Sequence, residues 1–150
     1  MKEVSIQFSK PEHGWIVSKI SDSAKSAELT VSDVPCDSLA MLVESANRLF
    51  GGSRKESVEW SLEPEYANWD FQLTEETIEL KAYDEASSKS HAFRENKTRL
   101  LRTIYNALKD IEPYFPSKEA PDDTQIWSWG FPSEGLVQLK QNIKKSEQSV

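Results

Sequence analysis

The chain has 150 residues, with 18 basic against 25 acidic side chains and a net charge of −7. This length favours a single domain over residues 1–150, and a hydrophobic content of 37% with 15 Trp, Tyr and Phe residues argues against disorder. A pI near 4.9 makes the chain poorly suited to bind nucleic acid or an anionic membrane surface.

Its segments also bear on location. The longest apolar run is the five residues 39–43, whereas a membrane-spanning helix needs about 20. The residues after Met1 form no apolar stretch of the kind found in a signal peptide. Cys36 is the single cysteine, which excludes an internal disulfide and is typical of a reducing compartment. We therefore expect a cytoplasmic protein that makes no use of a membrane.

In the first third, alternation of apolar and polar residues predicts three strands. A helical spacing of apolar residues follows, with Asp37 or Ser38 as the expected N-cap and Gly51 and Gly52 at the end. These elements are strands at 4–8, 15–20 and 27–31 and a helix from about 39 to 50.

The middle repeats this order. Clean alternation predicts three strands, the last two joined by a hairpin turn at 74–76, and a weaker strand follows near 91–93. Asn96 then caps a helix that Pro113 ends. These elements are strands at 58–62, 69–73, 78–82 and about 91–93, and a helix from about 97 to 112.

The remaining chain is expected to be irregular over the proline- and tryptophan-rich segment 113–132, helical over about 133–145, and frayed over 146–150. Alternating strands with one apolar side are typical of an antiparallel sheet that helices cover on one face. The sequence predicts an α+β fold with about six or seven antiparallel strands, two main helices on one face and a C-terminal helix. The other face would meet water or a partner.

Charge is unevenly distributed. Residues 56–85 contain ten acidic residues and one base, Lys81, whereas 86–109 contain six bases and one acid. Alternation places Glu59, Asp70 and Glu79 on the polar side of their strands, where like charges on neighbouring strands repel. Such a face can serve for solubility, dock a basic partner, or hold paired carboxylates for acid/base or metal chemistry. The segment has no histidine and no metal-ligand spacing.

The basic segment raises a second possibility. Arg99 and Arg102 lie in the first turns of the helix that Asn96 caps, where the helix dipole favours anions over cations. The acidic strand segment 56–85 of the same molecule, or a bound anion such as phosphate, would offset this cost.

Signals for catalysis are weak. His13 and His91 lie in no recognisable catalytic or metal motif, and Cys36 has no base that the sequence places near it. The sequence lacks the glycine-rich phosphate-binding motifs and the Gly-x-Ser-x-Gly motif. The aromatic segment 127–131 is expected to pack as a lid over the sheet edge or to form a recognition surface.

Several short motifs are spread over the first half of the chain. They are Phe8-Ser9 with His13-Gly14-Trp15, Val34-Pro35 with Asp37-Ser38-Leu39, Glu63-Pro64, and Trp69-x-Phe71. These motifs resemble a pattern in an uncharacterised family of small bacterial proteins. The likeness covers roughly the first 110 residues and implies no activity, since none is assigned to that family. In size, acidity and α+β composition the chain also resembles bacterial toxin-immunity proteins, which bind and block one partner toxin.

The sequence thus favours a non-enzymatic protein-binding module without a cofactor, possessing the character of an immunity-type inhibitor. It would dock a basic protein partner through its acidic sheet face. The alternative is a small-ligand or anion-binding domain that uses Arg99 and Arg102 with the segment 127–131. The residues expected to contact a protein partner are Glu59, Glu63, Glu65, Asp70, Glu79, Trp127 and Trp129.

Overall fold

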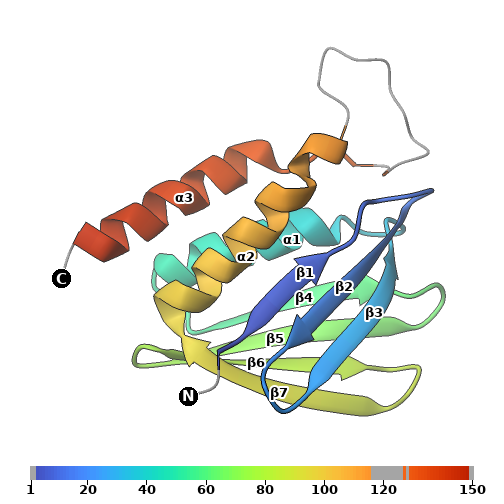
Figure 1. Ribbon diagram of the computed structural model, residues 1–150, viewed down its shortest axis with the longest axis horizontal. Coiled ribbons are helices and arrows are strands. Elements are labelled where there is room, and N and C mark those ends of the chain that lie inside the picture. Colours follow the sequence, from blue (N-terminus) through green and yellow to red (C-terminus); the bar gives the residue numbers. More distant parts are fainter. Residues whose placement is uncertain (1–2, 116–126, 128, 149–150) are drawn as a thin grey trace.

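The computed structural model describes residues 3–115, 127 and 129–148. Within these ranges the chain forms seven strands, three α-helices and one 3-10 turn (Figure 1). In chain order the elements are β1 (Ser5–Phe8), β2 (Trp15–Ser21), β3 (Ser26–Ser32), α1 (Ser38–Phe50), β4 (Lys55–Ser61), β5 (Tyr66–Thr74), β6 (Thr77–Asp84), β7 (Lys89–Asn96), α2 (Lys97–Ile111), η1 (Glu112–Tyr114) and α3 (Ser133–Gln148).

The strands form one antiparallel sheet in sequence order, which confirms the predicted α+β class. The sheet has two parts, because β3 and β4 pair through Ser32 and Ser61 alone whereas the strands within β1–β3 and within β4–β7 pair over most of their lengths. In Figure 1 the β1–β3 strands lie in front of β4–β7 and run obliquely across them. The β1–β3 strands therefore form one layer and the β4–β7 strands another.

One face of β4–β7, called here the inner face, carries the apolar side chains of the alternating pattern. Phe8 of β1 stacks on Trp60 and Trp69, whose ring centroids lie 5.1 Å apart. Helix α1 packs against β4, and α2 packs against β1, β6 and β7. The inner face is thus covered by both main helices, as the alternation predicts, and also by β1–β3, which was not predicted.

Helix α1 begins where predicted. The side chain of Asp37 accepts a hydrogen bond from the N–H of Ala40, and the helix ends at Gly51. Burial raises the pKa of Asp37, and the hydrogen bond from Ala40 offsets part of that increase. The apolar face of α1 is buried against the sheet and against α3.

The C-terminal helix is longer than expected. Ser146 lies in α3 within hydrogen-bond distance of Thr98, and Glu147 accepts a hydrogen bond from Arg102. These contacts with α2 hold the last turn, so fraying does not begin at residue 146. Gly135 is needed at the start of α3, since a Cβ there would lie 2.6 Å from a methyl group of Val43. Most of the predicted irregular segment 113–132 lies outside the described residues.

Candidate functional site

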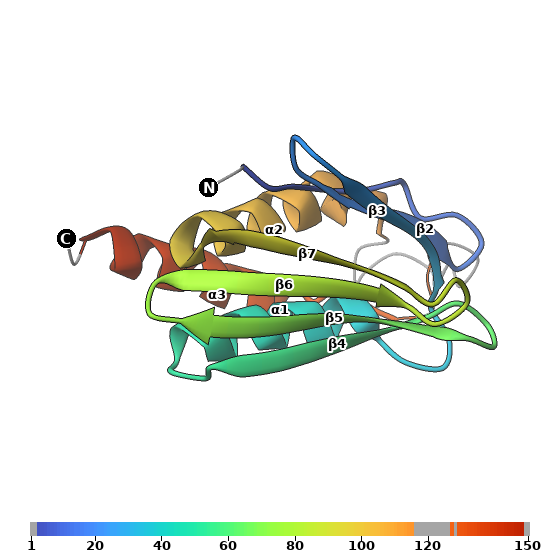
Figure 2. The same ribbon diagram turned by 90° about the horizontal axis from the view of Figure 1, so that it is seen from below.

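The outer face of β4–β7 is the surface left open by the fold. In Figure 2 these four strands face the viewer, and the three helices lie behind them. No described element lies over the strands on this side. Strand alternation directs mostly polar and charged side chains to this face. The residues whose side chains lie on it are Lys55, Ser57, Glu59, Tyr66, Asn68, Asp70, Gln72, Thr74, Thr77, Glu79, Lys81, Tyr83, Ser90, Ala92, Arg94 and Asn96.

The predicted acidic residues Glu59, Asp70 and Glu79 do share this face. In the folded sheet, however, two of these acids have basic neighbours, which a count of charges along residues 56–85 does not reveal. Asp70 is in register with Lys81, and Glu79 is in register with Arg94. Arg94 donates two hydrogen bonds of 3.1 Å to Glu79. The centre of the face therefore carries both signs of charge rather than a uniform negative charge.

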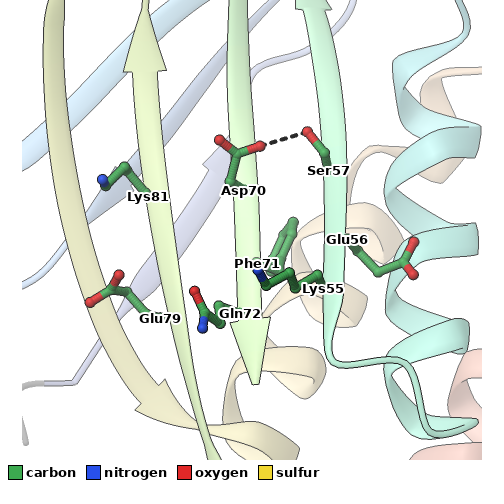
Figure 3. Close-up of a pocket in the computed structure, with 8 residues that line it drawn as sticks. All are labelled: Lys55, Glu56, Ser57, Asp70, Phe71, Gln72, Glu79 and Lys81. Atoms are coloured by element: carbon green, nitrogen blue, oxygen red, sulfur yellow. Dashed lines mark hydrogen bonds between the residues drawn. The ribbon is translucent and has the colours of Figure 1, made fainter. Parts of the chain in front are cut away.

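A shallow hollow of about 460 Å³ lies at this centre (Figure 3). The hydroxyl of Ser57 donates a 2.6 Å hydrogen bond to Asp70 across β4 and β5. The side chain of Glu56 turns toward the helix rather than toward Asp70, as Figure 3 shows. The residues that line the hollow are Lys55, Glu56, Ser57, Asp70, Phe71, Gln72, Glu79 and Lys81.

Glu56 is held at the edge of the sheet. It accepts hydrogen bonds from Arg48 of α1 at 2.7 Å and from Ser53 at 2.6 Å. Burial by itself raises the pKa of Glu56, but the hydrogen bonds from Ser53 and Arg48 outweigh it and lower the pKa below its usual value. This carboxylate is thus committed to the contact between α1 and β4.

The end of the outer face nearest the β4–β5 loop has a different character, and we call it the acidic end. It comprises Glu59, Glu63, Glu65 and Glu85, of which Glu63 and Glu65 are exposed in the loop. Tyr66 N–H donates to the Glu85 carboxylate, and Glu85 N–H donates to the Tyr66 carbonyl. These bonds join the β4–β5 loop to the β6–β7 turn. Residues 59–66 contain three acids and no base.

The two predicted tryptophans differ in position. Trp127 is 3% exposed and belongs to the core, so its ring is not on the surface that a partner would meet. Trp129 is 40% exposed, and its indole N–H donates to the carbonyl of Asp33. Because Asp33 follows the residue of β3 that pairs with Ser61, Trp129 lies at the same end of the sheet as the acidic end.

The predicted anion-binding arginines are both engaged. Arg102 pairs with Glu147 of α3, and Arg99 lies 3.9 Å from Glu95 of β7. The acids that offset these bases thus come from α3 and β7, not from the acidic segment 56–85. An anion at this helix would have to compete with two carboxylates.

Sequence reasoning missed Tyr66 and Tyr83, which are each 37% exposed on the outer face. The available signal was the alternation of buried and exposed residues. Tyr66 adjoins the buried Ala67 and Tyr83 adjoins the buried Ala82, so both tyrosines point to the outer face. A tyrosine at an outward position of an alternating strand is exposed unless another element covers it.

Other chemistry has little support in the described ranges. They contain no group of three or more His, Cys, Asp or Glu side chains placed to hold a metal ion. The thiol of Cys36 lies near Ser38 and the Glu59 carbonyl, at 3.7 and 3.8 Å. None of the helices described is both long and apolar enough to cross a membrane.

Comparison with known proteins found no matching family model, curated protein or solved structure. The function is therefore argued from the residues of this chain.

Proposed function

We propose that this protein is a binding module that docks a basic protein partner through the outer face of β4–β7. The observation that carries the proposal is an open four-stranded face that no described element covers. On it, exposed carboxylates at one end lack a base beside them. A rigid sheet of this kind offers a preformed surface, which reduces the entropy cost of binding.

Charge favours the acidic end as the part that a basic partner meets first. Glu59, Glu63 and Glu65 form no ion pair with a described residue, whereas Glu79 is paired with Arg94. Unpaired surface carboxylates attract a cationic partner over a distance and orient it, which raises the association rate more than the final affinity. Trp129 is exposed at the same end of the sheet, beside Asp33.

An inhibitor of the immunity type is the more specific form of this proposal. Such a protein blocks a single partner by covering its surface, so it needs a complementary face and no catalytic group. The uncovered outer face with its unpaired carboxylates supports this form of the proposal for a basic partner.

To test the proposal, this protein is immobilised and exposed to a lysate of the cells that produce it. The proteins that it retains are then identified at low and at high salt. We compare the wild type with E59K/E63K/E65K. The expected result is a basic partner that the wild type retains at low salt and the triple variant loses, because reversal replaces attraction by repulsion.

A matched control separates this effect from net charge. The variant E44K/D110K/E134K changes net charge by the same amount at exposed positions on α1, α2 and α3, the helices behind the outer face (Figure 2). It should retain the partner. Equal loss from both variants, or no loss from E59K/E63K/E65K, would contradict docking through this face.

A further inference from the structure

Two tyrosines stand next to each other on the outer face, at its acidic end. Tyr83 of β6 is in register with Asn68 of β5, and Tyr66 lies two residues before Asn68 on the same face. Side chains in this diagonal relation have Cβ atoms within about 7–8 Å. The two tyrosines are therefore diagonal neighbours on this face, each 37% exposed and without a ring-to-ring contact between them, and they are called the pair below.

Neither tyrosine of the pair binds a cation or forms a hydroxyl hydrogen bond within the part of the chain that the structure describes. Three other aromatic rings each hold a lysine of the chain itself, with the ammonium 5.1 to 5.5 Å from the ring centroid: Phe50, Phe93 and Tyr114. Among the described residues, no cation lies over Tyr66 or Tyr83, and neither hydroxyl forms a hydrogen bond. Both the ring faces and the hydroxyls are free to bind another molecule.

Carboxylates surround the pair. Glu65 precedes Tyr66 in the chain, Glu85 bonds the backbone of Tyr66, and Glu59 is in register with Asn68 between the two rings. Two bases lie near the pair. Lys81 shares the outer face, two residues before Tyr83, and is in register with Asp70. Lys89 is in register with Asp84, whose side chain alternates to the side opposite Tyr83. A cation on the outer face would thus meet aromatic rings and negative charge together.

We propose that Tyr66 and Tyr83 bind arginine side chains of the basic partner, with Glu59, Glu65 and Glu85 as acceptors for the guanidinium groups. This inference rests on the proposed function and names the chemistry of the partner. Arginine fits better than lysine, because its planar guanidinium stacks on an aromatic ring while its N–H groups donate to carboxylates in two directions. A lysine ammonium is more strongly hydrated and does not stack.

The test is an NMR titration of the ¹⁵N-labelled protein with two synthetic peptides of equal length and charge. One peptide alternates arginine with glycine, and the other alternates lysine with glycine. We expect the arginine peptide to bind more tightly and to shift the amide signals of Tyr66, Asn68 and Tyr83 most.

The variant Y66L/Y83L removes the ring faces and hydroxyls but keeps apolar side chains on the strands. It should bind the arginine peptide about five- to thirtyfold more weakly, which corresponds to the loss of two exposed cation–π contacts. Y114L removes a comparably exposed tyrosine elsewhere and should bind as the wild type does. Dispersed spectra of both variants establish that they are folded.

Equal affinity for the two peptides, or unchanged affinity in Y66L/Y83L, would overturn the arginine proposal. If the largest shifts then fall on Asp70 and Glu79, docking on the outer face stands without the tyrosines. If neither peptide shifts any signal of the outer face, the arginine proposal fails. Docking of a folded partner is then decided by the charge-reversal capture alone.

Discussion

The two faces of β4–β7 come from the same four strands and differ in how they treat charge. The inner face buries Trp60, Trp69 and Phe93. The three carboxylates on this side of the strands, Glu56, Asp84 and Glu95, each accept hydrogen bonds. The outer face leaves its charges in water and covers none of them. Folding requirements therefore account for the inner face, whereas they leave the composition of the outer face largely free.

This difference separates positions that stability constrains from positions that are free to serve binding. A buried carboxylate without donors would cost several kcal/mol, so the inner positions are constrained by stability. Outer positions tolerate substitution at little cost to the fold, since exposed charges contribute little to stability. A run of unpaired acids with two exposed tyrosines is thus better explained by contact with another molecule than by folding.

The largest effect is expected on the inner face. Trp69→Ala should lower the free energy of unfolding by about 3–5 kcal/mol, because it removes a buried indole and leaves a cavity beside Trp60 and Phe8. Urea denaturation followed by circular dichroism measures the change. Asp70→Asn, the next residue on the outer face, should change it by less than about 0.5 kcal/mol. Similar losses for both variants would remove the distinction between the faces.

A second, smaller effect concerns Glu95, which is 2% exposed. Its carboxylate accepts hydrogen bonds from the N–H groups of Val4 and Asn96, at 3.2 and 2.9 Å. Glu95→Ala should cost about 2–3 kcal/mol, since both donors lose their acceptor. Glu95→Gln retains an acceptor oxygen and should cost clearly less in the same urea measurement. A Gln variant as unstable as the Ala variant would show that the negative charge, not the acceptor, is required.

Local sequence signals predicted much of this architecture. Alternation located the strands and the hairpin at Glu75, while Asp37 and Asn96 were predicted as caps because their side chains bond the first turn of a helix. These features depend on residues close together in the chain. Asp37 was predicted together with Ser38 as an alternative, and the structure selects Asp37.

The candidate site was less predictable, because it depends on which strands become neighbours. Lys55 and Arg94 lie outside the acidic segment 56–85, yet the register brings both to the face of Glu79. Likewise Arg102 is paired by Glu147, 45 residues away in sequence. Local charge counts do not contain this information. The face predicted as acidic therefore has, in the structure, a centre with both signs of charge and an acidic end.

A third effect of about 1 kcal/mol is expected at Glu56, whose pKa lies below its usual value of 4.5. A carboxyl with a lowered pKa in the folded state stabilises the protein above the usual pKa, and this contribution is lost as the pH falls through the folded-state pKa. Glu56→Gln should therefore be less stable than the wild type at neutral pH, with the difference shrinking below about pH 4.5. A difference that stays constant from neutral pH to pH 3 would contradict this assignment.

The smallest effect is expected at the mixed centre of the outer face. Arg94→Ala should change the free energy of unfolding by at most about 0.5 kcal/mol, because its ion pair with Glu79 is exposed. It should also leave partner capture intact, since it does not touch the acidic end. A loss of capture in Arg94→Ala would place the docking surface at the mixed centre instead.

The most direct measurement is site-specific photo-crosslinking in the cells that produce the protein. A benzophenone amino acid replaces Asn68, which lies on the outer face in register with Glu59 and Tyr83, or, as a control, Val137, which is 58% exposed on α3. The account predicts an adduct with one basic protein from position 68, absent from position 137 and lost when E59K/E63K/E65K is added. An adduct from position 137 without one from position 68, or no adduct from either position, would contradict docking through the outer face of β4–β7.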